Sequence, residues 1–313
     1  LAEHLLDKQG VTSSNLVSPT NIMKKEIRSA LTSIVFLFCI YLLSFLGSNV
    51  VSTIQSINSF TFLLLLSVII QVVFFIPSFI LKTEKLYDLI GSTTYVIVAL
   101  IAYLSVDNKT STDTILFLFI IIWGTRLGTY LFKRIQRDSE DVRFEKAKRN
   151  FFWFLQYWMG QALWVSITSC AAVIAILKPE RDTLNIYGFI GILIWILGFT
   201  LEVIADLQKN NFKKSQNTTQ NFISSGLWSK SRHPNYFGEI TLWFGMYIIS
   251  LSSFSGFEYL TIISPIFVYI LLTRMSGINM LEKIADQRYG HLEDYLEYKE
   301  KTPLLVPYKI FIK

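Results

Sequence analysis

The sequence carries little charge: Asp, Glu, Lys and Arg make up 17% of its 313 residues, against about 25% in an ordinary soluble domain. Hydrophobic residues account for 52%, and several uninterrupted apolar runs reach roughly 20 residues, the length that crosses a bilayer. This composition argues against a soluble helical protein. The runs also lack the short alternation of an outer-membrane barrel. We therefore expect an all-α, polytopic membrane protein.

Cysteine and histidine are scarce as well. Cys39 and Cys170 both lie inside apolar segments, where a cysteine behaves as a small buried hydrophobe. Their number and spacing exclude a disulfide framework and a cysteine metal site. The three histidines, His4, His233 and His291, are far apart in the sequence. A histidine-rich metal centre is therefore not expected.

The familiar nucleotide-binding and targeting motifs are absent too. There is no Rossmann glycine fingerprint and no Walker lysine loop, so a nucleotide site would have to be of an unorthodox, membrane-embedded kind. Residues 1–22 have neither the cationic start nor the cleavage site of a secretory signal. We expect 1–22 to be a disordered or non-native extension and 23–313 to form one helical membrane domain.

The apolar runs define about eight membrane spans. Their expected positions are 30–47, 60–81, 89–106, 114–132, 151–177, 186–207, 235–252 and 258–275. The last two are separated only by a short, mildly polar stretch.

Basic residues are distributed unevenly between alternate loops. One set of loops contains only Lys109, Lys178 and Arg181, whereas the loops after the fourth and sixth spans are rich in Lys and Arg. By the positive-inside rule, both termini and the basic loops face the cytoplasm, in a bacterial inner membrane or the endoplasmic reticulum. Retention of these loops accounts for the net charge of +6 without a nucleic-acid partner.

Ionisable residues inside the predicted spans are functional candidates, because they are costly there. The side chain of Arg126 either extends toward the membrane surface or points inward to bind a carboxylate or phosphate. Arg134 lies about two turns further along the same helix. Glu202 and Asp206 are four residues apart, so they share one helix face and repel each other. The pair needs a counter-cation or the hydroxyls of a ligand, unless it is simply a solvated helix end.

The stretch "SRHPNYFGE" opens the seventh span with unusually many polar groups. Pro234 is tolerated in a first helical turn, which would leave Arg232 and His233 at a helix N-terminus suited to anions. Asn235 and Glu239 are four residues apart on the next face. Because these polar residues lie so close together in the sequence, we expect the stretch to form half of a ligand pocket and not a simple polar loop.

Three further residues complete the predicted pocket. Lys213 belongs to a basic, amide-rich loop whose cations suit phosphates. Tyr236 lies within the motif itself, and Tyr298 lies in a charged, tyrosine-rich tail. A solvated loop and a helix lying on the membrane surface are the simpler interpretations of the loop and the tail.

The segments that carry a resemblance to a known family run from about residue 82 to the C-terminus. They are "EKLYDLIGS", "WGTRLGTYLFKR", "EDVRF", "LEVIADLQKNNF", "GLWSKSRHPNYFGE" and the "Y..YK.KTP.L.P" tail. Together they resemble the steroid 5-alpha-reductase C-terminal-domain family, in its branch of unassigned function. The resemblance implies a helical membrane enzyme that binds NADPH in a cytoplasm-facing pocket, formed here within about 120–313. Characterised relatives reduce a carbon–carbon double bond in a steroid or another lipid by hydride transfer.

The resemblance also implies roles for individual residues. Glu202, Asp206 and Asn235 match positions that contact the cofactor. Arg126 and Arg134 match basic positions near its phosphates.

The sequence departs from the family at Trp123. Steroid reductases have a tyrosine at this position, which donates a hydrogen bond to the substrate ketone. An indole N–H can donate a hydrogen bond but is no comparable source of a proton. The family's acidic partner to that tyrosine falls near Asp88, so Asp88 and Tyr87 are the candidate acids. The departure leaves the lipid substrate undefined.

A second interpretation is a membrane methyltransferase of the isoprenylcysteine or phospholipid type, which uses S-adenosylmethionine. Such enzymes share an Arg-His-Pro-x-Tyr-x-Gly motif but commonly carry a Glu-Glu pair after the final hairpin, where this chain has Glu282-Lys283. A third is a lipid-binding or scaffold protein without catalysis. For the reductase interpretation we expect a lipid-like substrate and membrane lipids as partners, and no obligate protein partner.

Overall fold

The computed structural model describes residues 19–50, 52–138, 144–178, 184–215, 221–275 and 277–307. Within these ranges the secondary structure is almost entirely helical. The described strands, β1 (Thr53–Ile54) and β2 (Ile57–Asn58), form one small antiparallel hairpin. Most of the extension expected at 1–22 lies outside the described residues, and the first described helix begins at Pro19.

Each of the eight expected spans corresponds to helical structure. The long helices are α2 (Pro19–Ser44), α3 (Ser59–Ile80), α4 (Tyr87–Leu104), α5 (Ser111–Asp138), α6 (Phe151–Leu177), α7 (Ile186–Lys214) and α8 (Pro234–Ser250). The eighth is composite, with a 3-10 helix at Gly256–Ile262, α9 (Ile263–Ile270) and a π-helical turn at Leu271–Met275.

Shorter elements connect and follow these helices. Short 3-10 helices lie at Phe45–Gly47, Ala147–Arg149, Gly226–Ser229 and Leu251–Ser253, and the chain continues into α10 (Ile278–Tyr289) and α11 (Glu293–Lys301). Seven described helical stretches are long and apolar enough to cross a membrane. Helix α8 has 17 residues, the lower end of spanning length. The predicted all-α, polytopic class is confirmed.

Local sequence signals explain where several helices begin. The side chain of Asn58 caps α3 by accepting a hydrogen bond from the backbone N–H of Thr61 at 3.2 Å, and Asn185 caps α7 in the same way through Gly188. Asparagine is among the preferred residues at this position, because its oxygen satisfies a backbone donor that has no partner within the helix. Pro234 occupies the first turn of α8, as the sequence predicts.

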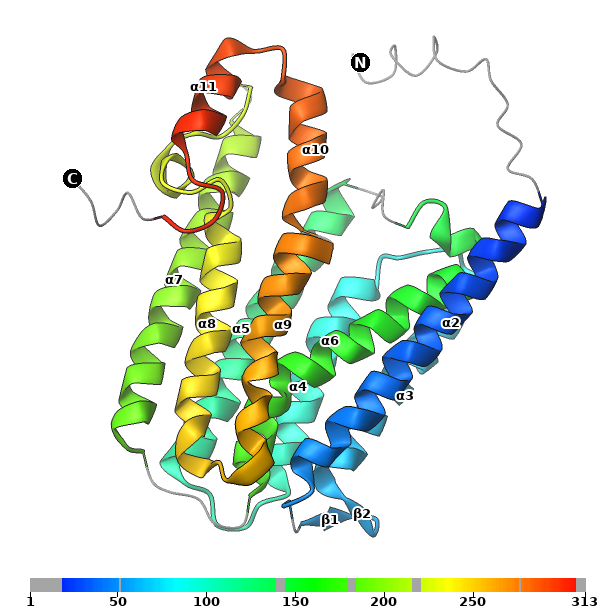
Figure 1. Cartoon of the computed structure of the whole chain (residues 1–313), viewed down its shortest axis with the longest axis vertical. Helices are drawn as coiled ribbons and strands as arrows, with labels where there is room; N and C mark the ends of the chain where they lie inside the picture. Colours follow the sequence, from blue (N-terminus) through cyan, green and yellow to red (C-terminus); the bar gives the residue numbers. More distant parts are fainter. Residues whose placement is uncertain are drawn as a thin grey trace.

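Large apolar side chains cover the outside of the helices. Ile34 on α2 is 61% exposed and Leu193 on α7 is 68% exposed, and each has many apolar neighbours of similar exposure. An apolar surface of this extent is not stable in water, whereas lipid tails solvate it. By contrast, α6 is buried along almost its whole length, and Figure 1 shows it passing through the middle of the bundle.

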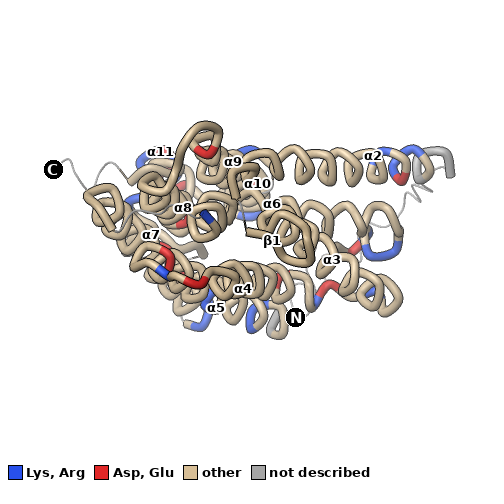
Figure 2. Tube along the Cα trace, turned by 90° about the horizontal axis from the view of Figure 1, so that it is seen from below, with Lys and Arg blue, Asp and Glu red and all other residues tan. Residues whose placement is uncertain are grey.

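The helices alternate in direction, so their ends gather at two levels (Figure 1). We call the level where α5 and α7 end and α8 begins the basic end, because the loops rich in Lys and Arg emerge there. Figure 2 shows the charged residues of α2 gathered at its N-terminal end, with the rest of that helix uncharged. Helices α10 and α11 also lie at the basic end.

Candidate functional site

Helices α7 and α8 pack backbone against backbone, and this contact positions the site. Gly191 and Gly198 on α7 face Gly245 and Gly238 on α8. A Cβ atom added to Gly198 would lie 2.5 Å from the backbone nitrogen of Leu242, closer than van der Waals contact permits. Small residues allow such close approach between membrane helices. Side chains at the ends of the two helices therefore meet at short range.

Arg126 of α5 is the counter-cation of the carboxylate pair. Its guanidinium forms ion pairs with both Glu202 and Asp206 on α7. The indole Nε1 of Trp123 donates to Glu202 Oε2 at 3.2 Å, and the amide of Asn235 on α8 donates to Asp206 Oδ1 at 3.1 Å. Three helices thus share one buried, hydrogen-bonded network.

A third carboxyl group enters this region from α8. Glu239 is 7% exposed and lies close enough to Glu202 and Asp206 to be affected by their charges. Its Oε1 has no hydrogen-bond partner among the described residues, which is costly for a buried polar atom. We call Glu202, Asp206 and Glu239 the acidic cluster. Arg126 forms ion pairs with two of its members, but its single positive charge offsets only one of the two carboxylates. Glu239, which has no such pair among the described residues, can carry a proton or accept a hydrogen bond from a ligand.

Arg232 and His233 meet an acidic partner at the start of α8. Glu282 of α10 forms an ion pair with Arg232 and lies 2.8 Å from the Nε2 atom of His233. Burial lowers the pKa of His233, while Glu282 acts in the opposite direction without reversing the shift. Lys299 of α11 approaches the same carboxylate at 3.9 Å. The predicted anion site therefore holds a side-chain carboxylate in this structure.

The C-terminal segment is fastened to the loop that precedes α8. The backbone N–H of Arg232 donates to the carbonyl of Pro303 at 2.9 Å, and the hydroxyl of Ser231 donates to that of Leu305 at 2.7 Å. Tyr298 donates to the carbonyl of Trp228 at 2.7 Å, and burial raises the pKa of its hydroxyl. Tyr298 therefore has a visible structural contact, and its predicted cofactor role stays a prediction.

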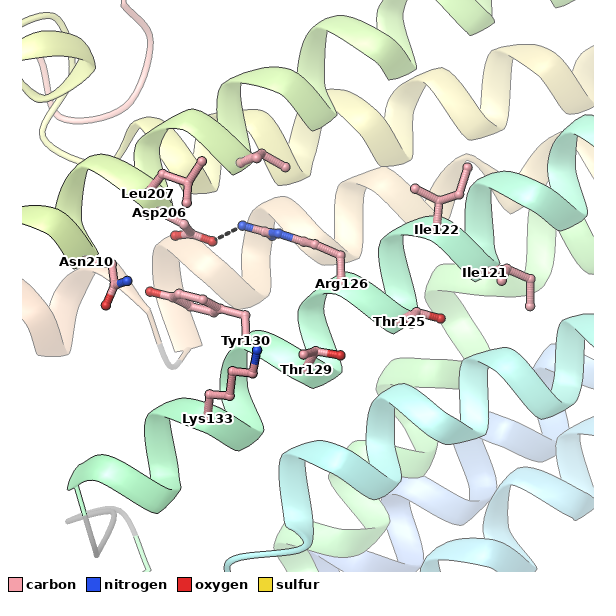
Figure 3. Close-up of a pocket in the computed structure, with 11 residues that line it drawn as sticks. Ile121, Ile122, Thr125, Arg126, Thr129, Tyr130, Lys133, Asp206, Leu207 and Asn210 are labelled. Carbon is pink, nitrogen blue, oxygen red and sulfur yellow. Dashed lines mark hydrogen bonds and ion pairs between the residues drawn. The ribbon is translucent and has the colours of Figure 1, made fainter.

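A cleft of about 640 Å³ opens between α5 and α7. Figure 3 shows Arg126 pointing from α5 toward Asp206 of α7 across this cleft, with Tyr130 reaching toward Asn210. The remaining walls are formed by Ile121, Ile122, Thr125, Thr129, Lys133, Val203 and Leu207. The inner network can therefore be approached from the side of the bundle.

Other predicted residues lie elsewhere. Tyr87 packs within a separate aromatic cluster and donates to the carbonyl of Tyr157 at 2.9 Å. Asp88 pairs with Arg134 at 3.3 Å. Lys213 is exposed near the end of α7. Their proposed catalytic and cofactor roles stay predictions.

Tyr236 lies beside the motif histidine, as its place in the sequence indicates. Its ring stacks on that of His233, with the ring centroids 5.7 Å apart. The contact holds the imidazole plane in position next to the first turn of α8.

Sequence reasoning missed two features of the site. It did not assign Glu282 as the partner of Arg232 and His233, because the two segments are about 50 residues apart. It also missed the glycine pairing between α7 and α8. A signal for that pairing was present, since "GILIWILG" and "GEITLWFG" each place two glycines seven residues apart and so on one helix face.

Comparison with known proteins gives two distant relatives. An uncharacterized protein of Schizosaccharomyces pombe is 22% identical over 220 residues, which cover 59% of this chain and 60% of that protein. A Delta(14)-sterol reductase of Methylotuvimicrobium alcaliphilum is 25% identical over 186 residues, which cover 55% of this chain and 40% of the reductase. The chain therefore matches less than two thirds of either relative.

A protein-family match covers much more of the chain. Residues 74–302 match the family described as "Protein of unknown function (DUF1295)". The matched range includes the Arg126 network, the whole of α8 and both short helices at the basic end. The chain belongs to the DUF1295 family.

Proposed function

We propose that this protein is a membrane reductase that uses NADPH to reduce a carbon–carbon double bond in a lipid. The observation that carries the proposal is the acidic cluster, which sets an unpartnered carboxyl oxygen of Glu239 beside the polar start of α8. Such an atom deep among helices is a functional candidate by default. The similarity to a sterol reductase supports the reaction class. We further propose that the basic end faces the cytoplasm, where NADPH is present.

The residues present fit the chemistry of this cofactor. Carboxylates and the Asn235 amide suit ribose hydroxyls, and Glu239 Oε1 supplies the unfilled acceptor. Arg126 is already paired with two carboxylates, so a phosphate would have to compete for it or contact other cations. Arg134, Lys213 and Arg232 are the cations predicted for that role. His233, whose pKa is lowered by burial, can offer a ring N–H to a phosphate, and Tyr236 and Tyr298 lie beside the motif. NADPH would supply the hydride.

The residues of the chain would bind and orient the cofactor and the lipid, and would donate a proton to the lipid. Helices α5, α7 and α8 bury Glu202 and Asp206 beside Arg126, and a charge interaction is stronger where the surroundings are less polar than water. Trp123 is fully buried and already donates to Glu202, so it orients that carboxylate rather than supplying a proton. We retain Asp88 and Tyr87 as the proposed acids, which requires the lipid to reach the basic end of α4.

Thermal unfolding of the detergent-purified protein tests the cofactor. A ligand that binds only the folded state raises the unfolding temperature. We expect stabilisation by NADPH and none by S-adenosylmethionine. Stabilisation by S-adenosylmethionine alone would overturn the reductase proposal.

Two variants refine this test. Asn235→Ala removes the amide that contacts Asp206, so we expect it to abolish stabilisation by NADPH. Trp123→Phe keeps the aromatic core and should leave it intact. Normal NADPH binding by Asn235→Ala would show that the cofactor assignment is wrong.

The methyltransferase alternative keeps one supporting observation. Methyltransferases of this type carry a Glu-Glu pair where this chain has Glu282 and Lys283. Glu282 contacts both Arg232 and His233. The same unfolding experiment distinguishes the two, because each proposal names a different ligand.

A further inference from the structure

The cleft between α5 and α7 changes in character along its length. Isoleucines at 121 and 122 and Val203 form its apolar part, whereas Lys133 and Asn210 lie toward the basic end. Arg126 and Asp206 are set into the wall between these parts (Figure 3). The volume of about 640 Å³ falls within the range of small-molecule sites. A ligand that matches it has one apolar and one polar end.

The position of the cleft indicates that this ligand comes from the membrane. Ile122 is 45% exposed and Leu207 is 54% exposed, so the opening faces the same side as the apolar helix surface. From Ile121 to Lys133, α5 rises about 18 Å, which is close to the thickness of one hydrocarbon leaflet, roughly half of 30 Å. The cleft therefore matches one lipid in one leaflet.

The charge at the polar end selects the headgroup. Lys133 is exposed there, whereas Arg126 is paired with Glu202 and Asp206. Among the charged residues that line the cleft, the charges of Arg126 and Asp206 offset each other, so the remaining lining charge is the positive charge of Lys133. We propose that the cleft binds one membrane lipid with an anionic headgroup, whose chain lies along Ile121, Ile122 and Val203.

Lipid binding itself needs no cofactor. The further conclusion that the bound lipid is the substrate rests on the proposed function. In that case the substrate is an anionic amphipathic lipid, and its chain passes Arg126 within the cleft. A neutral, fused-ring sterol does not use the positive charge of Lys133.

Native mass spectrometry of the full-length protein tests the proposal. The protein is released from nanodiscs that contain equal amounts of dioleoyl phosphatidylglycerol and dioleoyl phosphatidylcholine, and the retained lipids are counted. We expect one retained phosphatidylglycerol per protein. Lys133→Gln should reduce the preference for this lipid about fivefold, the effect of one basic residue near an anionic membrane lipid. Ile122→Trp should fill the cleft and reduce retention of both lipids.

Matched controls lie on α7, outside the lining of the cleft. Ile204→Trp adds the same bulk at an exposed position of α7, and Lys214→Gln removes an exposed lysine from its end. Both should behave as the unmodified protein.

Unchanged retention and preference in Ile122→Trp and Lys133→Gln would overturn the proposal. So would displacement of the lipid by inorganic phosphate, because the site would then recognise a free anion. NADPH is absent throughout, so failure here is distinct from failure of the proposed function.

Discussion

Two clusters of buried charge lie near opposite ends of α8, and they differ in how completely they are satisfied. Beyond its C-terminal end, Glu258 is fully buried and accepts from Lys178 at 2.6 Å, from the backbone of Ser255 at 2.7 Å and from Asn49 at 3.3 Å. Near its N-terminal end, Glu239 has an oxygen with no partner among the described residues.

The difference distinguishes a structural cluster from the acidic cluster, which we propose to be functional. A fully satisfied polar network fixes one arrangement of the chain, and Glu258 also caps the 3-10 helix that begins at Gly256. An unsatisfied buried carboxyl group stabilises nothing by itself, so its place in the fold calls for a ligand or a proton. The four predictions below test this contrast, from the largest effect to the smallest.

Lys178→Met should cause the largest loss of stability. It leaves Glu258 buried without a counter-ion, and breaking a buried pair from one side costs about 3–5 kcal/mol. Thermal unfolding in detergent measures this loss. The double variant Lys178→Met/Glu258→Leu is the control, because replacing both partners by apolar residues is often nearly neutral. A single variant as stable as the parent would show that the cluster is not structural.

Gly198→Val should come next, and it should affect the functional cluster as well. A Cβ atom would lie 2.5 Å from the nitrogen of Leu242 and 2.7 Å from the carbonyl oxygen of Gly238, so α7 and α8 must separate. Overpacking of this kind costs about 1–3 kcal/mol. We expect lower stability and no stabilisation by NADPH, because Asn235 moves away from Asp206.

Gly160→Ala is the control for that substitution. Its Cβ atom would approach only ring carbons of Phe36, at 3.3 Å, and a side chain can shift more easily than a helix backbone. Equal loss of stability in the two glycine variants would contradict the close packing of α7 on α8.

The sequence was sufficient to predict the helices and part of the site. Length and hydropathy locate a helix at each of the eight apolar segments, because a lone segment in lipid can satisfy its backbone hydrogen bonds only as a helix. The ends are less well predicted, since α2 begins 11 residues before the expected span and α7 ends 7 residues after it. The four-residue spacing of Glu202 and Asp206 left a counter-cation, ligand hydroxyls and a solvated helix end open, and the structure places Arg126 of α5 against both carboxylates. Pro234 correctly predicted the start of α8.

The remaining parts depend on contacts between distant segments. Nothing local pairs Arg126 with residues some 80 positions away, or Glu282 with His233. The same limit applies to Tyr87, whose neighbours come from α3, α6 and the segment before α6. A sequence motif shows which residues resemble those of a family, whereas the structure shows which residues contact one another.

Glu239→Gln should change stability by less than about 0.5 kcal/mol, because it replaces a carboxyl group that lacks a full set of partners by an amide of the same shape. Binding of NADPH should nevertheless weaken about tenfold if Glu239 accepts a hydrogen bond from it. Thermal unfolding with and without NADPH measures both effects. Glu258→Gln is the matched control and should lose stability without any specific effect on NADPH. The reverse pattern would mean that the two clusters have been assigned the wrong way round.

The pH dependence of stability gives the smallest and most specific test. Burial lowers the pKa of His233 in the folded protein, with Lys209 and Arg232 acting in the same direction and Glu282 opposing them. The unfolded chain therefore takes up this proton first, near the ordinary value of about 6.5. The stability that neutral His233 contributes is present above that pH and is lost as the pH falls below it.

Unfolding temperatures between pH 8 and pH 5 should consequently decline on the acid side, and His233→Gln should make that decline shallower. The variant keeps a polar side chain beside Glu282 but has no proton to exchange in this range. Carboxyl groups in the acidic cluster remain in both proteins, so the difference between the two profiles isolates the imidazole. Identical profiles would show that His233 titrates with the same pKa in the folded and unfolded chain, and that its contact with Glu282 fully offsets its burial.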